Sequence, residues 1–192
     1  MTDSAHADHA TDDRTTRRAL LGAGVVGAAI ALAGARPVSA AASGLSDDDL
    51  AVAGFAISLE LTARDLYDAA IEAGADDDVW TVMREQHEAY AQRLAGITGI
   101  SAQLREEATY EQLSEVFATS DPSEPAFELE NIAAATHAEL LGSVADVAIA
   151  AAMASFVSME SRHATVLAAL SGQGDDLDAL FSNSATALSP EA

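Results

Sequence analysis

The spacing of helix-breaking residues is the feature that most constrains how this chain folds. No proline occurs between Pro37 and Pro122, and alanine is abundant in this stretch. No segment alternates apolar and polar residues as an exposed β-strand does, so the pattern predicts helices. Ser46 and the aspartates after it suit a helix N-terminus, and Gly74 and Gly99 suit two helix ends. The chain is therefore expected to be all-α.

These signals predict four long helices and one short one. We expect helices from Ser46 to about Ala73, from Val79 to about Thr98, from Ser123 or its neighbour to about Ser143 and from Asp146 to about Leu170, with a short helix over Tyr110–Phe117. Because short connections between long helices force antiparallel neighbours, the predicted fold is an antiparallel four-helix bundle over residues 43–172. Residues 173–192 are expected to form an acidic, flexible tail, whose residues able to dock on the bundle are Leu177, Leu180 and Phe181.

The first 42 residues match a twin-arginine export signal. Arg17-Arg18 precedes the apolar run Ala19–Ala35, which Arg36-Pro37 ends. The run has 17 residues, of which four are glycine and seven alanine, so it is short and weakly apolar against the about 20 residues of a stable membrane span. We expect cleavage near residues 38–42 and export by the twin-arginine machinery to the periplasm, cell wall or medium. An uncleaved N-terminal membrane anchor is the alternative.

The charge balance excludes several classes of partner and of chemistry. The chain has nine arginines, no lysine and 31 acidic residues, a net charge of -22. Residues 1–42 hold four arginines and four aspartates, so this net charge belongs to the rest of the chain. A nucleic-acid partner needs a basic face and is not expected. The absence of cysteine excludes disulfides and thiolate ligands, and the absence of lysine excludes Schiff-base chemistry.

Carboxylates and histidines fall on the apolar faces of the predicted helices. Residues three, four and seven apart share one face of a helix. On this basis Glu60, Glu130 and Glu160 each lie in the apolar stripe of a different helix, with His163 beside Glu160. His87 lies among aromatic and apolar residues of the remaining helix. Since an ionised carboxylate in an apolar interior costs several kcal/mol, three of them need a common partner, and metal ions bound by carboxylate and imidazole would provide it.

The distances of the candidate ligands from the two expected turns fit a shared site well in the second hairpin and less well in the first. Glu130 and Glu160 each lie 15 residues from the expected turn near residue 145, so they should face each other. Glu60 lies 16 residues before the turn near residue 76, and His87 lies 11 after it. This mismatch of five residues is about 7 Å along a helix.

The same residues also have interpretations without metal. Glu160 and His163 can form a buried hydrogen-bonded pair with an arginine as counter-ion, while the other two glutamates lie at a hydrated edge. His87 is explained equally well as a ligand or as a packed core residue. His137 is expected to be structural. Three further glutamates fall off the apolar faces and are expected at the surface, namely Glu85, Glu88 and Glu139.

Four motifs resemble those of ferritin-like proteins. Glu160-Ser161-Arg162-His163 resembles the Glu-x-x-His motif of their fourth helix. The other three motifs are Leu59-Glu60 with Leu66-Tyr67 in the first helix, His87-Glu88-Ala89-Tyr90 with Leu94 in the second, and Leu129-Glu130 in the third. The resemblance covers about residues 46–172 and is greatest to exported bacterial ferritin-like domain proteins with twin-arginine signals.

The resemblance implies a site for one or two ions of iron or manganese, held by Glu60, His87, Glu130, Glu160 and His163. It also implies redox chemistry with oxygen or peroxide, with Tyr67 close by. The sixth family ligand is a glutamate three residues before the second-helix histidine, and here that position is Arg84, so the ligand set is incomplete. Either Arg84 swings out, with Glu85 or Glu88 in its place, or its guanidinium points in and replaces the metal. In the second case the chain is a non-catalytic ferritin-like scaffold with an envelope or stress-associated interaction role.

Overall fold

The regular structure of residues 44–190, the part of the chain that the computed structural model describes, consists of six α-helices and no strand. They are α2 (Asp47–Glu72), α3 (Asp78–Thr98), α4 (Glu107–Phe117), α5 (Ser123–Leu140), α6 (Val147–Leu170) and α7 (Leu177–Phe181). The prediction of an all-α chain is confirmed for these residues.

Short polar side chains begin three of the long helices at the predicted places. The side chains of Ser46, Asp77 and Asp146 each accept a hydrogen bond from a backbone N–H in the first turn of α2, α3 and α6. Gly99 ends α3 with a φ of 77°, a left-handed conformation that glycine adopts without a Cβ clash. Local sequence signals therefore set most of the boundaries of the long helices.

α5 begins at Ser123, as predicted, but its C-terminal end departs from the prediction. It ends at Leu140 rather than at about Ser143, and a turn over residues 141–143 follows it. The residue before it is Pro122, which makes no side-chain cap bond, and Ser123 lies inside the helix. The short helix α4 begins before Tyr110 because the Glu106 carboxylate accepts hydrogen bonds from two backbone N–H groups of its first turn. Residues 177–181, which were expected to lie in a flexible tail, form the single turn of α7.

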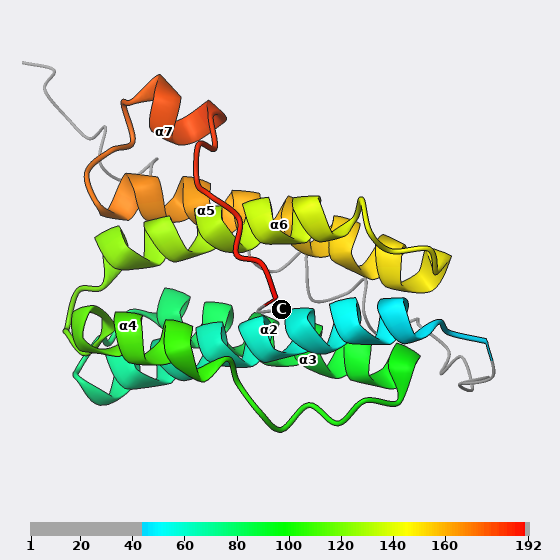
Figure 1. The fold of residues 1–192 in the computed structure, drawn as a ribbon. Coiled ribbons are helices and arrows are strands. Elements are labelled where there is room, and N and C mark those ends of the chain that lie inside the picture. The colour runs from blue at the N-terminus through cyan, green and yellow to red at the C-terminus, as the bar shows by residue number, and fades with distance from the viewer. Residues whose placement is uncertain (1–43, 191–192) are drawn as a thin grey trace, which may run out of the picture. The chain divides into compact units, whose positions relative to one another are not determined.

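The four long helices form two antiparallel hairpins (Figure 1). α2 and α3 pack along each other, as do α5 and α6. The hairpins meet through α3 against α6 and through α2 against α5. Contacts within each hairpin are far more extensive than contacts between hairpins, and α2 and α5 touch at few positions. α4 packs on α2 and also reaches α5.

The core has two apolar clusters with a polar layer between them. One cluster includes Ile57, Leu94 and Phe156, and the other includes Leu66, Trp80, Phe117 and Leu167. On α3 and α6 the residues between these clusters include His87, Glu160 and His163, all of them buried. The helices therefore bring ionisable side chains to the middle of an otherwise apolar interior.

The predicted export signal lies outside the described residues, so its structure is not part of this description. Within residues 44–190, no helix combines the length and the apolar character that crossing a bilayer requires.

Candidate metal centre

Six ionisable side chains meet in the polar layer, and we call them the inner cluster. They are Glu60 from α2, His87 from α3, Glu130 and His137 from α5, and Glu160 and His163 from α6. Five are at most 1% exposed, and His163 is 6% exposed. All five residues that the sequence suggested as ligands therefore lie together, and His137 joins them.

The first triad of the inner cluster consists of His87, Glu130 and His163. Glu130 Oε1 lies 3.0 Å from Nε2 of His87, and Glu130 Oε2 lies 3.1 Å from Nδ1 of His163. The Tyr67 hydroxyl donates to Glu130 Oε1 at 2.5 Å. His163 Nε2 lies 2.7 Å from Oε1 of Gln86. Every buried side-chain nitrogen and oxygen of this triad has a hydrogen-bond partner.

The second triad consists of Glu60, His137 and Glu160, and its polar atoms are not all satisfied. His137 Nδ1 lies 2.9 and 3.2 Å from the two carboxylate oxygens of Glu160, and its Nε2 lies 3.4 Å from Oε1 of Glu60. Three buried atoms have no partner in hydrogen-bonding geometry: Glu60 Oε1, His137 Nε2 and Glu160 Oε1. One such atom costs about 1–3 kcal/mol, so three of them, from three helices, call for further partners.

His87 joins the two triads. Its Nδ1 lies 2.6 Å from Oε2 of Glu60, while its Nε2 faces Glu130. A carboxylate oxygen only accepts hydrogen bonds, so an imidazole between two carboxylates donates from both nitrogens and carries a positive charge. The two triads therefore form one continuous network through a protonated histidine.

The contact between Glu60 and His87 corrects the mismatch expected in the first hairpin. α2 ends at Glu72 and α3 begins at Asp78, so the turn is centred on residue 75, one residue earlier than expected. The remaining offset of three residues is about 4.5 Å along a helix, and two long side chains bridge it. In the second hairpin, Glu130 contacts His163, one turn beyond Glu160, rather than Glu160 itself, which contacts His137.

Burial and the neighbouring charges shift the pKa values in this cluster. Burial lowers the pKa of His137, but the carboxylates of Glu160 and Glu60 outweigh burial and raise the pKa to about 9. Burial also lowers the pKa of His87, and the Glu130 and Glu60 carboxylates raise it well above its usual value. Without a metal ion, protons on these two histidines therefore offset carboxylate charge at neutral pH.

The pKa values of Glu130 and Glu160 shift in opposite directions. Burial raises the pKa of Glu130, but its two histidine partners outweigh burial and lower the pKa well below its usual range. Burial raises the pKa of Glu160 more than His137 lowers it, and Glu60 and Glu130 add repulsion. Glu130 is thus firmly ionised, whereas Glu160 has less compensation for its charge.

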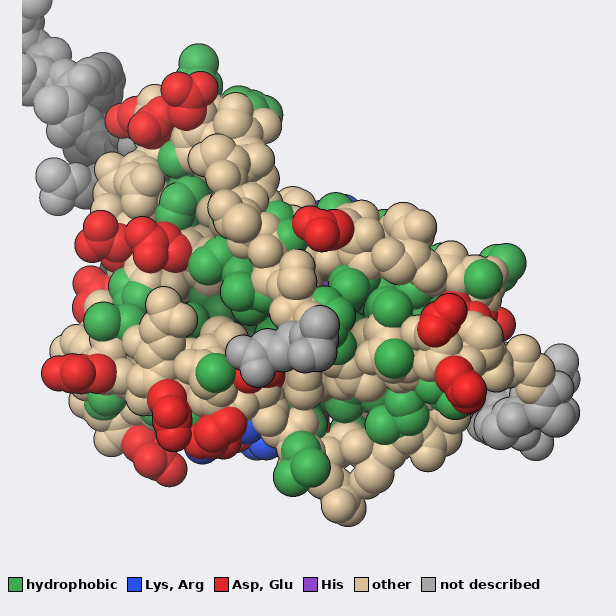
Figure 2. All heavy atoms as spheres, in the orientation of Figure 1, with side chains coloured by type: hydrophobic (Ala, Val, Ile, Leu, Met, Phe, Trp, Pro, Cys, Tyr) green, Lys and Arg blue, Asp and Glu red, His purple; other side chains and the backbone are tan. Residues whose placement is uncertain are grey.

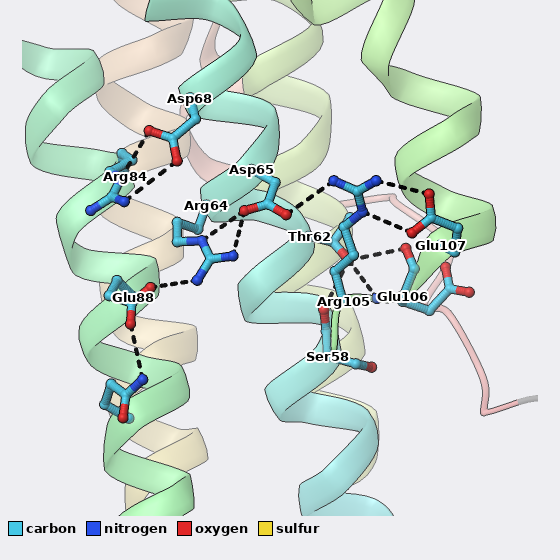
Figure 3. Close-up of polar contacts among 11 residues, drawn as sticks. Ser58, Thr62, Arg64, Asp65, Asp68, Arg84, Glu88, Arg105, Glu106 and Glu107 are labelled. Atoms are coloured by element: carbon cyan, nitrogen blue, oxygen red, sulfur yellow. Dashed lines mark hydrogen bonds and ion pairs between the residues drawn. The ribbon is translucent and has the colours of Figure 1, made fainter. Parts of the chain in front are cut away.

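Arg84 pairs with Asp68 of α2, as Figure 3 shows, and not with a residue of the inner cluster. Its Nε donates to Oδ1 of Asp68 at 3.0 Å, and the two side chains are 34% and 42% exposed. The alternative in which the guanidinium pairs with a buried glutamate is therefore wrong. Neither proposed substitute enters the cluster, since Glu85 is exposed and Glu88 bonds to Arg64 at 2.7 Å.

Arg84 belongs to a partly exposed set of ion pairs over α2, α3 and α4, which we call the outer network. Its members are Arg64, Asp65, Asp68, Arg84, Glu88, Arg105 and Glu107. Arg105 lies 3.1 Å from Asp65 and 2.8 Å from Glu107, and so links α2 to α4 (Figure 3). The outer network neutralises carboxylates at the surface and contributes no side chain to the centre.

Two residues of the site were missed by the sequence analysis. His137, which was expected to be structural, is 1% exposed and lies in the second triad. The signal for it was present, because it follows Glu130 by seven residues and so shares its helix face. Gln86 contacts His163 from a position beside His87, and its neutral side chain gave no signal. Tyr67, expected near the site, donates directly to Glu130.

The chemistry of the donor set fits a first-row transition metal. Three carboxylates and three imidazoles are ligands that iron, manganese and zinc accept. In each triad, one ligand atom from each residue lies within 4.8 Å of the other two. Each triad is a group able to hold one ion, and in the second triad three buried polar atoms lack a hydrogen-bond partner.

Comparisons with protein-family models, with curated proteins and with solved structures give no match to this chain. The functional argument therefore rests on the geometry and the chemistry of the inner cluster.

Proposed function

We propose that this protein is an exported, ferritin-like four-helix bundle that binds one or two ions of iron or manganese in the inner cluster. The ions are held by the five residues of the sequence prediction together with His137, so His137 completes the set that Arg84 leaves short. The bound metal supplies redox chemistry with oxygen or peroxide.

The single observation that carries this proposal is the burial of three ligand atoms of the second triad without partners in hydrogen-bonding geometry. Glu60 Oε1, His137 Nε2 and Glu160 Oε1 are buried and lack hydrogen-bond partners. They come from α2, α5 and α6 and belong to one group that is able to hold a cation. A cation bound to this group would be a partner for carboxylate oxygens that hydrogen bonds leave unpartnered.

The arrangement of the helices supports the ferritin-like part of the proposal. Two antiparallel hairpins each supply ligands, with Glu60 and His87 from one and Glu130 and Glu160 from the other. Carboxylates and histidines that project inward from four helices are the pattern of di-metal sites in helical bundles. Tyr67, buried against Glu130 and stacked on His87, is the residue placed to exchange protons or electrons with the centre.

A metal-free scaffold is the second candidate, and one observation favours it. Glu130 already accepts hydrogen bonds from Tyr67, His87 and His163, so the first triad is satisfied by protons alone. In this case the bundle acts as an envelope or stress-associated interaction protein. The two candidates predict different metal contents.

The deciding experiment is elemental analysis of the folded protein, produced with iron and manganese supplied. About two ions per chain support occupation of both triads, and about one supports the second triad alone. Glu160→Ala is expected to abolish binding at the second triad. Glu139→Ala is the matched control, because Glu139 is an exposed glutamate in α5, and it is expected to leave the metal content unchanged. A wild-type protein that folds and holds no metal supports the scaffold instead.

The export part of the proposal rests on the twin-arginine pattern in residues 1–42. Replacing Arg17 and Arg18 by lysine is expected to keep the protein in the cytoplasm, which fractionation of the producing cells measures. Unchanged export would contradict the twin-arginine route.

A further inference from the structure

A small cavity reaches the inner cluster from the side where α2 and α5 meet. Its volume is about 20 Å³, which has room for about one water molecule. Three residues of the inner cluster line it, namely Glu60, His87 and His137. Its outer wall includes Thr136 from α5 and Leu188 from the segment that follows α7. The cavity therefore lies between the candidate ligands and the C-terminal segment.

The residues 183–188, which we call the strap, run from α7 across α5 toward α2 (Figure 1, in red). Two hydrogen bonds hold the strap on α5. Asn183 Nδ2 donates to the carbonyl oxygen of Asn131 at 2.8 Å, and the N–H of Leu188 donates to Oγ1 of Thr136 at 2.9 Å. Thr136 directly precedes His137, so the strap is fastened one residue from a candidate ligand.

Leu188 occupies a place that helix packing leaves unfilled. α2 and α5 touch at few positions, whereas the helices within each hairpin pack along their length. The Leu188 side chain is half-buried there, beside Leu59 of α2 and Ile132 of α5. Figure 2 shows apolar side chains, in green, on both sides of the segment on this face. One leucine from the tail thus covers the cavity that the helices leave open.

The strap has few attachments compared with the helices beneath it. Asn183, Ser184 and Thr186 are exposed, and the two hydrogen bonds to α5 are the ones that hold residues 183–188 to the helices. Segments with few buried contacts and exposed hydrogen bonds open locally at low cost, without unfolding of the core. The strap is therefore able to open while the four long helices stay in place.

We infer that the strap closes the route to the inner cluster and that Leu188 selects what passes by size. With the strap closed, small molecules such as water, dioxygen, hydrogen peroxide or azide pass more readily than larger oxidants and ligands. This inference rests on the proposed function for the identity of the centre. The geometry of the cavity and the strap is independent of metal.

The test compares how fast ligands of two sizes reach the centre. The full chain is loaded with Co(II), whose visible absorption responds to ligand exchange, and is mixed with azide or with the larger imidazole. The variants are Leu188→Ala and a chain that ends at Ser182. Leu180→Ala is the matched control, because Leu180 is also a half-buried leucine of the C-terminal segment but does not line the cavity.

We expect the two strap variants to bind the same amount of Co(II) as the wild type. Imidazole is expected to react at least tenfold faster with them, with a smaller increase for azide, while Leu180→Ala behaves as the wild type. Equal imidazole rates in the wild type and the strap variants would overturn the inference. An equal increase in reaction rate in the Leu180→Ala control would also overturn it.

A second readout needs no metal and separates this inference from the proposed function. In the metal-free protein, the C2 hydrogen of the His137 imidazole exchanges slowly with deuterium in water, and mass spectrometry follows it. The strap variants are expected to show faster exchange at His137 and unchanged exchange at His6, which precedes the helices. A protein that binds no Co(II) but shows this difference refutes the metal proposal and keeps the strap. A protein that binds Co(II) but shows neither difference supports the metal proposal and refutes the role of the strap.

Discussion

The inner cluster and the outer network both set carboxylates against cations, but they use different cations in different surroundings. In the outer network the cations are arginines, and the side chains of Arg64 and Asp65 are 23% and 21% exposed. In the inner cluster the cations are histidines, and the contacting atoms of His87, Glu60 and Glu130 are shielded from water. An ion pair therefore contributes differently to the free energy of unfolding in the inner cluster and in the outer network.

Histidine, unlike arginine, allows a metal ion to take the place of a proton in the inner cluster. An arginine keeps its proton under all ordinary conditions and offers no lone pair. A histidine releases its proton to a base and presents a nitrogen lone pair to a metal ion. Arginine at the surface thus makes permanent ion pairs, whereas histidine in the interior makes a pair that a metal ion is able to replace.

The largest effect is expected when a carboxylate is removed from the inner cluster. Glu130→Gln leaves His87 and His163 facing an amide in place of an ionised group. Removing one partner of a buried ion pair costs about 3–5 kcal/mol, because the other charge stays buried and unpaired. Urea unfolding of the metal-free protein measures this loss in the free energy of unfolding.

Glu88→Gln is the matched control in the outer network. Glu88 bonds to Arg64 at 2.7 Å, and its side chain is 31% exposed. Its loss is expected to cost at most about 1 kcal/mol, since water solvates both groups. Equal losses for the two variants would show that burial does not distinguish the two regions.

Asp49 provides an intermediate case, in which backbone N–H groups take the place of a cation. Its carboxylate accepts hydrogen bonds from the N–H of Ala145 at 2.7 Å, from the Ser46 hydroxyl at 2.8 Å and from the N–H of Asp146 at 3.3 Å. The Ala145 and Ser46 hydrogen bonds lower the pKa of Asp49 below 3.8. This carboxylate ties the connection between α5 and α6 to the start of α2.

The sign of the pH dependence follows from the lowered pKa. A carboxyl group with a lower pKa in the folded state stabilises the fold above its unfolded pKa, and this contribution disappears as the pH falls through the folded pKa. The stability difference between the wild type and Asp49→Asn is therefore expected to be full at pH 7 and to shrink below about pH 4. Urea unfolding of both proteins over this range measures it, and a difference that grows in acid would contradict this account.

The smallest effect is expected at Arg84. Arg84→Glu introduces the glutamate that the resemblance to ferritin-like proteins would place there, but the side chain at this position lies beside Asp68. We expect a loss of about 0.2–1 kcal/mol from the exposed ion pair and no gain in metal content. Arg84→Ala separates the lost pair from the added repulsion. A gain of one metal ion in Arg84→Glu would show that this side chain turns inward.

Local signals predicted the helices well because a cap or a glycine acts within one turn. Ser46, Asp146 and Gly99 mark helix ends in the sequence and in the structure. The end of α5 and the docking of the tail were less predictable. Leu177 and Phe181 were candidates for docking, yet they are 67% and 84% exposed, and Leu188 lies against the helices instead. Docking depends on a gap between packed helices, and such a gap cannot be predicted from a local sequence pattern.

The candidate ligands were predictable from helix periodicity, but their pairing was not. A charged residue in an apolar stripe indicates burial, which identified Glu60, Glu130 and Glu160 correctly as buried residues. Which histidine meets which glutamate depends on the offsets between neighbouring helices. His137 pairs with Glu160 across two helices, so its role appears only when the helices are placed together.

Each triad takes its members from both hairpins. Glu60 stands opposite His137 and Glu160, and His87 stands opposite Glu130. An ion in either triad is therefore a crosslink between hairpins, in a chain that has no cysteine and so no disulfide. Glu60 and Glu160 are 100 residues apart, and fixing the ends of a long loop restricts the unfolded chain more than fixing those of a short one. With the proposed ions bound, the supply of free metal sets this protein's resistance to unfolding, as oxidising conditions set it for proteins held by disulfides.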